Sequence, residues 1–246
     1  MIQNDEIKVD MAIHQGHHDA LRIAGRGRVD IRLSVLGKIT HSSQDEGGSN
    51  ALAGALVALD RLKKIMPTPN SKVDPVAGFK PRLTPIVMES YPKPPGHMWG
   101  TGSAGHTLQN LVRVTLDRRI LMQETVDQAV QEIREAIGDL SPWKYRIERG
   151  AYHFPWNVPK ESPVVKFASQ AITEMVGEPP KIDFMTPAWD VGAVNRLGIP
   201  CVTYGTAGPM VVDPPIGPHC ENDFATLNWI YESAKVYAYF AATATA

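Results

Sequence analysis

Residues 29–35 (Val-Asp-Ile-Arg-Leu-Ser-Val) alternate strictly between apolar and polar side chains, and this feature constrains the fold more than any other. A period of two predicts a strand with one face buried and the other in water. Other periodic segments surround it in the order βαββαβ, which is the split βαβ or ferredoxin-like arrangement. Strands are predicted at 29–35, 86–88, 111–116 and 145–152, and helices at 52–62 and 126–137.

The segment after Pro155 alternates helices with strands, which is typical of an α/β fold. Only two or three strands are recognisable, which is few for an independent sheet. The helices are predicted at 162–177, 190–197 and about 223–241, and the strands at 182–185 and 199–204. In the last helix the apolar spacing predicts an inward face made by Leu227, Ile230, Ala234 and Tyr237.

The composition excludes several classes of partner. The 246 residues carry 25 Lys and Arg against 26 Asp and Glu, so there is no basic excess for binding nucleic acid. No apolar run reaches the roughly 18 residues of a membrane span, and the first twenty residues do not follow the pattern of a secretory signal. Cys201 and Cys220 are too few for a disulfide framework. We expect a cytoplasmic globular protein.

Three short motifs point to chemistry, and each has a simpler interpretation. Residues 100–105 fit GxGxxG but lack the preceding strand and following helix that dinucleotide binding requires, so we interpret them as a loop. His14, His17 and Asp19 are residue types that bind zinc, although a solvated terminus is the favoured interpretation. His41 is close to Ser43 in sequence, but near neighbours seldom face each other, so no Ser–His pair is expected.

Several phrases occur together in one order. Gly37-Lys-Ile-Thr-His41-Ser-Ser43 precedes Gly48-Ser-Asn50-Ala51, and Asp117-Arg118-Arg119 precedes Glu124-Thr125. Gly198-Ile-Pro200, Tyr204-Gly205 and His219-x-x-Asn222-Asp223 follow near the C-terminus. With the βαββαβ order, these phrases resemble the dizinc amidohydrolase and metallopeptidase family of acetylornithine deacetylase, succinyl-diaminopimelate desuccinylase, aminoacylase and glutamate carboxypeptidase.

The resemblance implies a domain organisation. Residues 23–154 correspond to the lid or dimerisation domain, which pairs two subunits of a homodimer. Residues 1–22 correspond to a remnant of the catalytic domain, and residues 155–246 to its C-terminal part. The expected fold is therefore α/β, with a ferredoxin-like α+β lid followed by a partial zinc-peptidase domain. The lid has a complete set of elements and should fold alone.

The resemblance also implies roles for single residues. Family members use two zinc ions, or cobalt or manganese, and hydrolyse the amide bond of N-acyl amino acids or small peptides. By position, His219 is a zinc ligand, and His41 is the lid histidine that reaches the oxyanion across the dimer. Arg119 would bind the substrate carboxylate, and Gly205 would line the pocket beside it.

Each of these roles has an alternative. His219 and His41 are also compatible with ordinary surface histidines, and Arg119 with a salt bridge at the end of a strand. The family has a further substrate-binding residue before the Asp117 motif. It corresponds to His106 or to Asn110, and the spacing from Asp117 does not decide between them.

The chain departs from the family in its metal ligands. The family's H-x-D motif, bridging Asp and Glu-Glu pair precede the lid, and residues 10–17 contain no Glu at the place of the last acidic ligand. One histidine cannot hold a zinc ion that three or four ligands normally secure. We therefore predict an incomplete, inactive portion of such a hydrolase, with an exposed apolar edge at 199–204. The alternative is a non-catalytic module for dimerisation and small-molecule binding.

Overall fold

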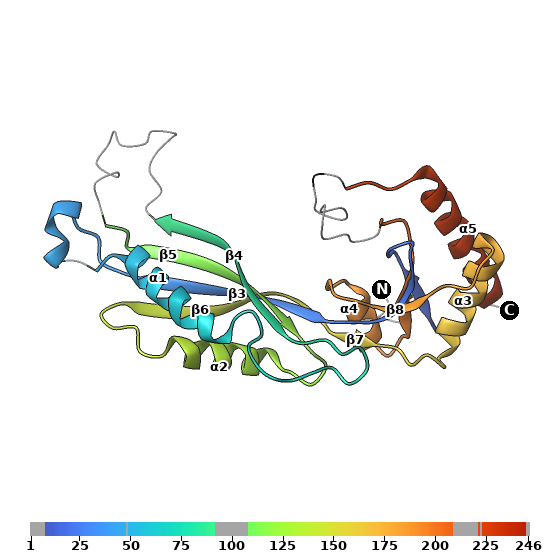
Figure 1. The fold of residues 1–246 in the computed structure, drawn as a ribbon, viewed down its shortest axis with the longest axis horizontal. Coiled ribbons are helices and arrows are strands. Elements are labelled where there is room, and N and C mark those ends of the chain that lie inside the picture. The colour runs from blue at the N-terminus through green and yellow to red at the C-terminus, as the bar shows by residue number, and fades with distance from the viewer. Residues whose placement is uncertain (1–7, 48, 92–107, 209–220, 222, 245–246) are drawn as a thin grey trace. The chain divides into compact units, whose positions relative to one another are not determined.

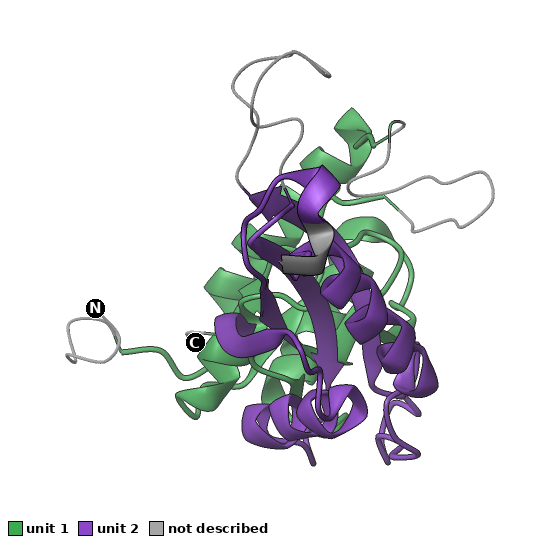
Figure 2. Ribbon diagram, turned by 90° about the vertical axis from the view of Figure 1, so that its left-hand side faces the viewer, with its two compact units in different colours: residues 1–27, 153–246 green, residues 28–152 purple. Residues whose placement is uncertain are grey.

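The structure is a computed structural model that describes residues 8–47, 49–91, 108–208, 221 and 223–244. The chain divides into two compact units, which Figure 2 shows in different colours. Unit 1 combines residues 1–27 with 153–246, and unit 2 consists of residues 28–152. Within the described ranges no helix has the length and hydropathy to cross a membrane.

Unit 2 contains a four-stranded sheet and two helices, in the βαββαβ order predicted from the sequence (Figure 1). The sheet order is β4-β5-β3-β6, and β4 pairs antiparallel with β5. Short 3-10 helices span Ser42–Gly47 and Lys63–Ile65. The regular elements are β3 (Gly27–Leu36), α1 (Ala51–Leu62), β4 (Arg82–Tyr91), β5 (Leu111–Ile120), α2 (Val126–Ile137) and β6 (Lys144–His153).

The core of unit 2 follows from the alternation in its strands. In β3 the apolar residues of the alternating run are fully buried, as are the even-numbered residues of β5. Helix α1 adds small residues to this core, because Ala51, Ala55 and Ala58 face inward while Leu52 and Leu56 are exposed. Close packing at Gly54 explains this orientation, since the Trp143 ring occupies the space where a β-carbon would lie.

Unit 1 contains a five-stranded sheet drawn from both ends of the chain. Its order is β1-β9-β2-β7, and β8 also pairs with β2. The strands are β1 (Ala12–His14), β2 (Leu21–Gly25), β7 (Trp156–Asn157), β8 (Ile182–Met185) and β9 (Cys201–Thr203), and the helices are α3 (Pro163–Val176), α4 (Val191–Arg196) and α5 (Leu227–Ala244). Strands β1, β2 and β7 were not predicted, because they are short and show no alternation.

Two predictions for unit 1 are wrong. The edge of residues 199–204 is covered, because β9 lies between β1 and β2 and is fully buried. Helix α5 begins at Leu227 and buries Ser233, Val236 and Phe240. Of the four residues predicted to face inward, Leu227, Ile230 and Ala234 are exposed, and Tyr237 is half-buried with its hydroxyl donating to the Tyr204 carbonyl. The helix is apolar on more than one side, so its sequence alone does not determine which side faces the sheet.

Candidate functional site

The loop before α1 holds His41 in a defined local geometry. Its Nδ1 lies 2.8 Å from Ser43 Oγ and 3.2 Å from the Ser43 backbone nitrogen. A backbone N–H can only donate, so Nδ1 accepts, and the neutral imidazole then carries its proton on Nε2. The prediction that His41 and Ser43 would not face each other is therefore wrong. The side chain is exposed and oriented as a hydrogen-bond donor at Nε2.

The open face of the unit 2 sheet carries a chain of ion pairs around Arg119. The guanidinium of Arg119 donates to both carboxylate oxygens of Asp117, at 2.7 and 2.9 Å. Arg28 lies 3.3 Å from the same carboxylate and 2.7 Å from that of Asp30. Asp117 thus uses two of the five N–H donors of Arg119, and three remain for a further acceptor.

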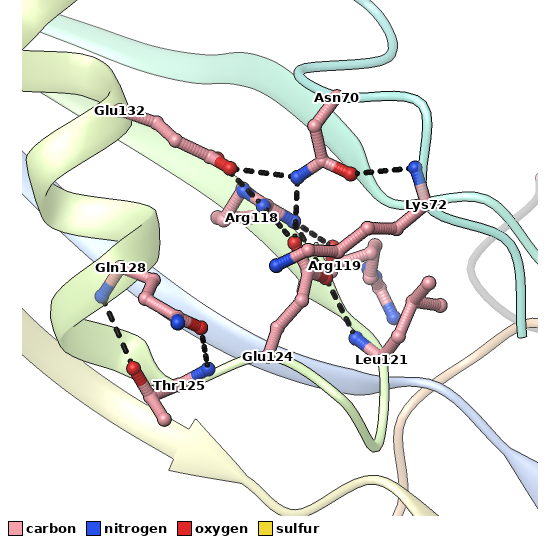
Figure 3. A network of polar contacts seen from close by, with 9 residues as sticks. All are labelled: Asn70, Lys72, Arg118, Arg119, Leu121, Glu124, Thr125, Gln128 and Glu132. Carbon is pink, nitrogen blue, oxygen red and sulfur yellow. Dashed lines mark hydrogen bonds and ion pairs between the residues drawn. The ribbon is translucent and has the colours of Figure 1, made fainter.

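The neighbouring Arg118 lies on the opposite, helix-covered face of β5 and is fully buried. Its guanidinium lies 2.6 Å from Glu124 and 2.8 Å from Glu132 (Figure 3). Asn70 donates to both carboxylates, at 2.8 and 2.7 Å, and the Leu121 amide donates to Glu124 at 2.9 Å. This network joins β5, α2 and the loop that holds Asn70. Sequence reasoning missed it, although the charge at Arg118 in an alternating strand was the available signal.

Burial and charge act in opposite directions on Glu124. Burial alone raises the pKa of this carboxyl, but the hydrogen bond and the positive charge of Arg118 lower it more, with help from Asn70 and Leu121. The net result is a pKa below the ordinary value of 4.5. Glu124 is therefore ionised at neutral pH and stabilises the fold, and it is a poor proton donor or acceptor for catalysis.

Asn110 lies immediately before β5, with an exposed side chain. Its backbone nitrogen donates to the Tyr91 carbonyl at 3.1 Å, and its carbonyl accepts from Gly37 at 2.8 Å. The backbone of Asn110 thus joins three segments of unit 2. His106, the alternative for the same substrate-binding role, lies outside the described residues.

In unit 1 the loops that follow the parallel strands β1 and β9 are joined by backbone hydrogen bonds. The Gly205 amide donates to the His17 carbonyl at 3.1 Å, and the Ala207 amide donates to the Gly16 carbonyl at 3.0 Å. Gly205 is buried, and a β-carbon there would lie 2.6 Å from the Gly16 nitrogen and 2.7 Å from the Tyr237 hydroxyl. Only glycine fits this close approach of the two loops.

His17 is a core residue and His14 lies in β1, so the interpretation of this segment as a solvated terminus is wrong. His17 is buried, its Nδ1 lies 2.6 Å from the Gly208 carbonyl, and its ring stacks on Trp189 at 5.5 Å. His18 stacks on Trp229 and lies 2.8 Å from the Glu232 carboxylate.

The same contacts test whether unit 1 can hold the zinc ions that the resemblance implies. His14 and His17 each use Nδ1 on a backbone carbonyl, and Asp19 forms a two-pronged salt bridge with Arg22. In the described part of the chain no three side chains of the metal-binding types lie together, so these residues do not fit a zinc site. His219 lies outside the described residues. Burial raises the pKa of Cys201 to about 12, which keeps this thiol protonated and unsuited to a metal.

A cavity of about 440 Å³ opens beside the two loops. Ligands of open α/β sheets bind outside the carboxyl ends of parallel strands, and this cavity adjoins the residues that follow β1 and β9. Its walls are partly aromatic and partly polar, and they consist of Gln15, Trp189, Thr206, Ala207, Asp223, Phe224 and Ala225.

Comparisons with known proteins identify relatives of this arrangement. Residues 23–144 match the model of the peptidase dimerisation domain M20_dimer. The uncharacterized protein YgeY of Escherichia coli K12 is 27% identical over 195 residues, which cover 73% of this chain and 45% of YgeY. The chain thus spans less than half the length of this curated relative.

Solved structures share the fold. A tripeptidase from Staphylococcus aureus superimposes with a TM-score of 0.66 at 15% identity, over 95% of this chain and 57% of its own. Human carnosine dipeptidase 1 superimposes with a TM-score of 0.67 at 15% identity, over 94% of this chain and 58% of the dipeptidase chain. The M20 family metallo-carboxypeptidase Sso-CP2 from Sulfolobus solfataricus superimposes with a TM-score of 0.67 at 15% identity, over 97% of this chain and 65% of the carboxypeptidase chain. Each relative therefore carries a substantial part that this chain does not match.

Proposed function

This chain belongs to the M20 peptidase family, whose dimerisation domain it carries at residues 23–144, and on that premise we propose that it is part of a metal-dependent amide hydrolase. The substrates are N-acyl amino acids or small peptides. The chain by itself is inactive, because its described residues do not assemble a metal site. The match to the peptidase dimerisation domain carries the hydrolase proposal. The missing ligands belong to the part of the family fold that precedes the lid.

The roles of the site residues follow from the family positions and from local chemistry. His41 acts as a hydrogen-bond donor to the oxyanion, and the acceptor role of its Nδ1 supports this by leaving the proton on Nε2. Arg119 binds the substrate carboxylate with the donors that Asp117 leaves available. Asn110 or His106 contributes a further contact to the substrate.

Two residues serve the site in unit 1. Gly205 fixes the loop that borders the pocket, because its backbone amide donates a hydrogen bond to the His17 carbonyl. His219 is a metal ligand. The cofactor is a pair of zinc ions, with cobalt or manganese as alternatives. The buried, unpaired Cys201 supports a reducing compartment, and we place the protein in the cytoplasm.

Metal content and turnover together test this function. The purified chain, dialysed against zinc, should retain well below one ion per chain and should not measurably hydrolyse N-acetyl amino acids or dipeptides. Joined to the family segment that carries the H-x-D and Glu-Glu motifs, it should gain about two ions and activity. Stoichiometric zinc with turnover in the isolated chain would contradict the proposed inactivity. A metal-loaded, joined protein without turnover would contradict the hydrolase assignment.

The partner of this chain is a second copy, bound through unit 2. Strand β4 is the end strand of its sheet, and Ile86, Val87 and Met88 on it are 39–49% exposed. An apolar end strand favours pairing with another strand, and identical strands pair through a two-fold axis. Leu52 and Leu56 on α1 add exposed apolar surface in the same unit.

A charge on β4 should separate the copies. Val87→Lys places an ammonium group in the proposed interface, so light scattering at about 20 µM should change from dimer to monomer, a loss of at least tenfold in affinity. Val76→Lys is the matched control, since Val76 is 47% exposed in a loop of the same unit. A monomeric wild type, or a Val87→Lys variant that remains dimeric, would contradict this interface.

A non-catalytic module for dimerisation and small-molecule binding is the second candidate. It is favoured by the lack of a metal-binding cluster among the described residues, combined with the cavity beside Trp189. Calorimetric titration of N-acetyl amino acids distinguishes the two candidates. The module predicts binding by the isolated chain and no gain of turnover in the joined protein.

A further inference from the structure

A cavity of about 160 Å³ lies on the open face of the unit 2 sheet. Three neighbouring strands line it, because β3 lies between β5 and β6 in the sheet (Figure 1). Asp30 and Arg32 come from β3, Thr115 from β5, and residues 148–151 from β6. Asp30, Arg32 and Thr115 alternate with core residues of their strands, so their side chains share the face opposite the core.

Gly150 explains why the face is hollow at this point. A β-carbon on Gly150 would lie 3.2 Å from both Cβ and the carbonyl oxygen of Asp30. A larger residue would extend a side chain into the space beside Asp30, whereas glycine leaves that space open. The volume corresponds to roughly five water molecules at about 30 Å³ each, so a ligand with about six or seven non-hydrogen atoms fits it.

Arg32 and Glu148 bring opposite charges to this cavity without pairing with each other. Both residues are exposed, and within the described ranges neither side chain forms an ion pair or a hydrogen bond. The two other charged residues of the lining are paired, Asp30 with Arg28 at 2.7 Å and Arg149 with Asp127 at 3.1 Å. The cavity therefore offers one available cation and one available anion.

A ligand that complements this cavity carries a negative and a positive group on a small frame. Arginine binds a carboxylate through two parallel N–H donors. An ammonium group has three N–H donors, which the Glu148 carboxylate and the Thr115 hydroxyl can accept. A free α-amino acid carries both groups on one carbon atom, and the volume favours a small one such as alanine or serine.

We propose that this cavity is a binding site for a small free α-amino acid, whose carboxylate binds Arg32 and whose ammonium binds Glu148. The Thr115 hydroxyl accepts a further hydrogen bond from the ammonium. The site lies entirely within unit 2 and uses none of the residues proposed for amide hydrolysis. It therefore does not depend on the hydrolase assignment.

Titration of L-alanine into the isotope-labelled full chain tests the site, because backbone amide chemical shifts report where a ligand binds. The amides of Thr115, Gly150 and Ala151 should shift together with a Kd of about 1 mM or tighter. Propionate and ethylamine each carry one of the two charges and should bind at least tenfold more weakly. N-acetylalanine, which lacks the ammonium, should also bind at least tenfold more weakly at these amides.

Charge-removing variants identify the two binding groups. Arg32→Gln and Glu148→Gln should each raise the Kd for L-alanine at least tenfold. Both side chains are exposed, so the thermal melts of these variants should match the wild type. Arg146→Gln is the matched control, because Arg146 is an exposed arginine of β6 outside the cavity lining, and it should bind as the wild type does.

Several results would overturn the inference. One is the absence of shifts around the cavity at about 20 mM L-alanine, and another is binding of propionate as tight as that of alanine. Wild-type affinity in either glutamine variant, or an equal loss in Arg146→Gln, would also contradict it. Shifts confined to residues around Trp189 would place the ligand in unit 1 instead. Binding is measured without zinc or turnover, so none of these results bears on the hydrolase proposal.

Discussion

Two adjacent arginines in β5 have opposite environments because side chains alternate across a strand. Arg118 points to the helices, where Glu124 and Glu132 neutralise its charge. Arg119 points to the open face, where Asp117 neutralises its charge. The sequence predicted a special function for Arg119, the half-buried member of the pair, and did not predict the buried network around Arg118. A buried charge is tolerated only with partners, and these partners lie on other elements.

The contact between Gly54 and Trp143 leads to a prediction at the scale of one residue. Replacement of a mid-helix glycine by alanine usually stabilises a helix by about 1 kcal/mol. At Gly54 the new β-carbon would lie 2.6 Å from Trp143 Cγ, so Gly54→Ala should instead lower the free energy of unfolding by about 1–2 kcal/mol. Urea denaturation measures this change.

A second substitution provides the control for the Gly54 prediction. In a Trp143→Leu background the ring is absent, and adding Gly54→Ala should then cost less than it does in the wild type. An equal cost in both backgrounds would show that the clash with the ring is not the cause.

At the scale of elements, the buried network connects three parts of unit 2 that are distant in sequence. Asn70 belongs to the loop between α1 and β4, Arg118 to β5, and Glu132 to α2. Helix α2 is also fixed at its start, where Thr125 and Gln128 form a reciprocal capping box. The capping signals are local and could be predicted, whereas the network required knowledge of which elements meet.

The lowered pKa of Glu124 predicts a pH dependence of stability. A carboxyl with a depressed pKa in the folded state contributes stability that is present above its ordinary value of 4.5 and is lost as the pH falls through the folded-state pKa. Glu124→Gln should lower the free energy of unfolding at pH 7 by about 3 kcal/mol, because it leaves Arg118 short of a buried partner. As the pH falls from 4.5 through the lowered pKa of Glu124, the difference between wild type and variant should shrink.

Asp127→Asn is the matched control on the same helix. Asp127 pairs with Arg149 at 3.1 Å on the surface, and an exposed pair contributes about 0.5 kcal/mol. Urea midpoints between pH 3 and pH 7 distinguish the two variants. Equal effects of both at pH 7 would contradict the structural role of the network.

At the scale of the whole molecule, the two units differ in how the chain builds them. Unit 2 is continuous and has its own core. Unit 1 is discontinuous, and its strand β2, from the N-terminal segment, pairs with β7, β8 and β9 from the C-terminal segment. The position of unit 2 between these segments explains why the β1 and β2 strands were not recognised as parts of a common sheet.

The fragments should therefore behave differently. Residues 28–152 expressed alone should unfold cooperatively, with a Tm within about 5 °C of the corresponding transition in the full chain. Residues 153–246 alone lack β2 and should remain unfolded. Circular dichroism and thermal melts measure both results. A cooperatively folded 153–246 fragment would contradict the central role of β2.

The sequence by itself determined the local elements of this protein. Alternation in β3, the capping residues of α2 and the glycine after α3 act over a few neighbouring residues, so their positions follow from the order of residues alone. Only the tertiary structure decided which face of α1 and α5 is buried, which carboxylates hold Arg118, and that His17 is a core residue. These outcomes depend on contacts between segments far apart in the chain, whose energies no local pattern contains.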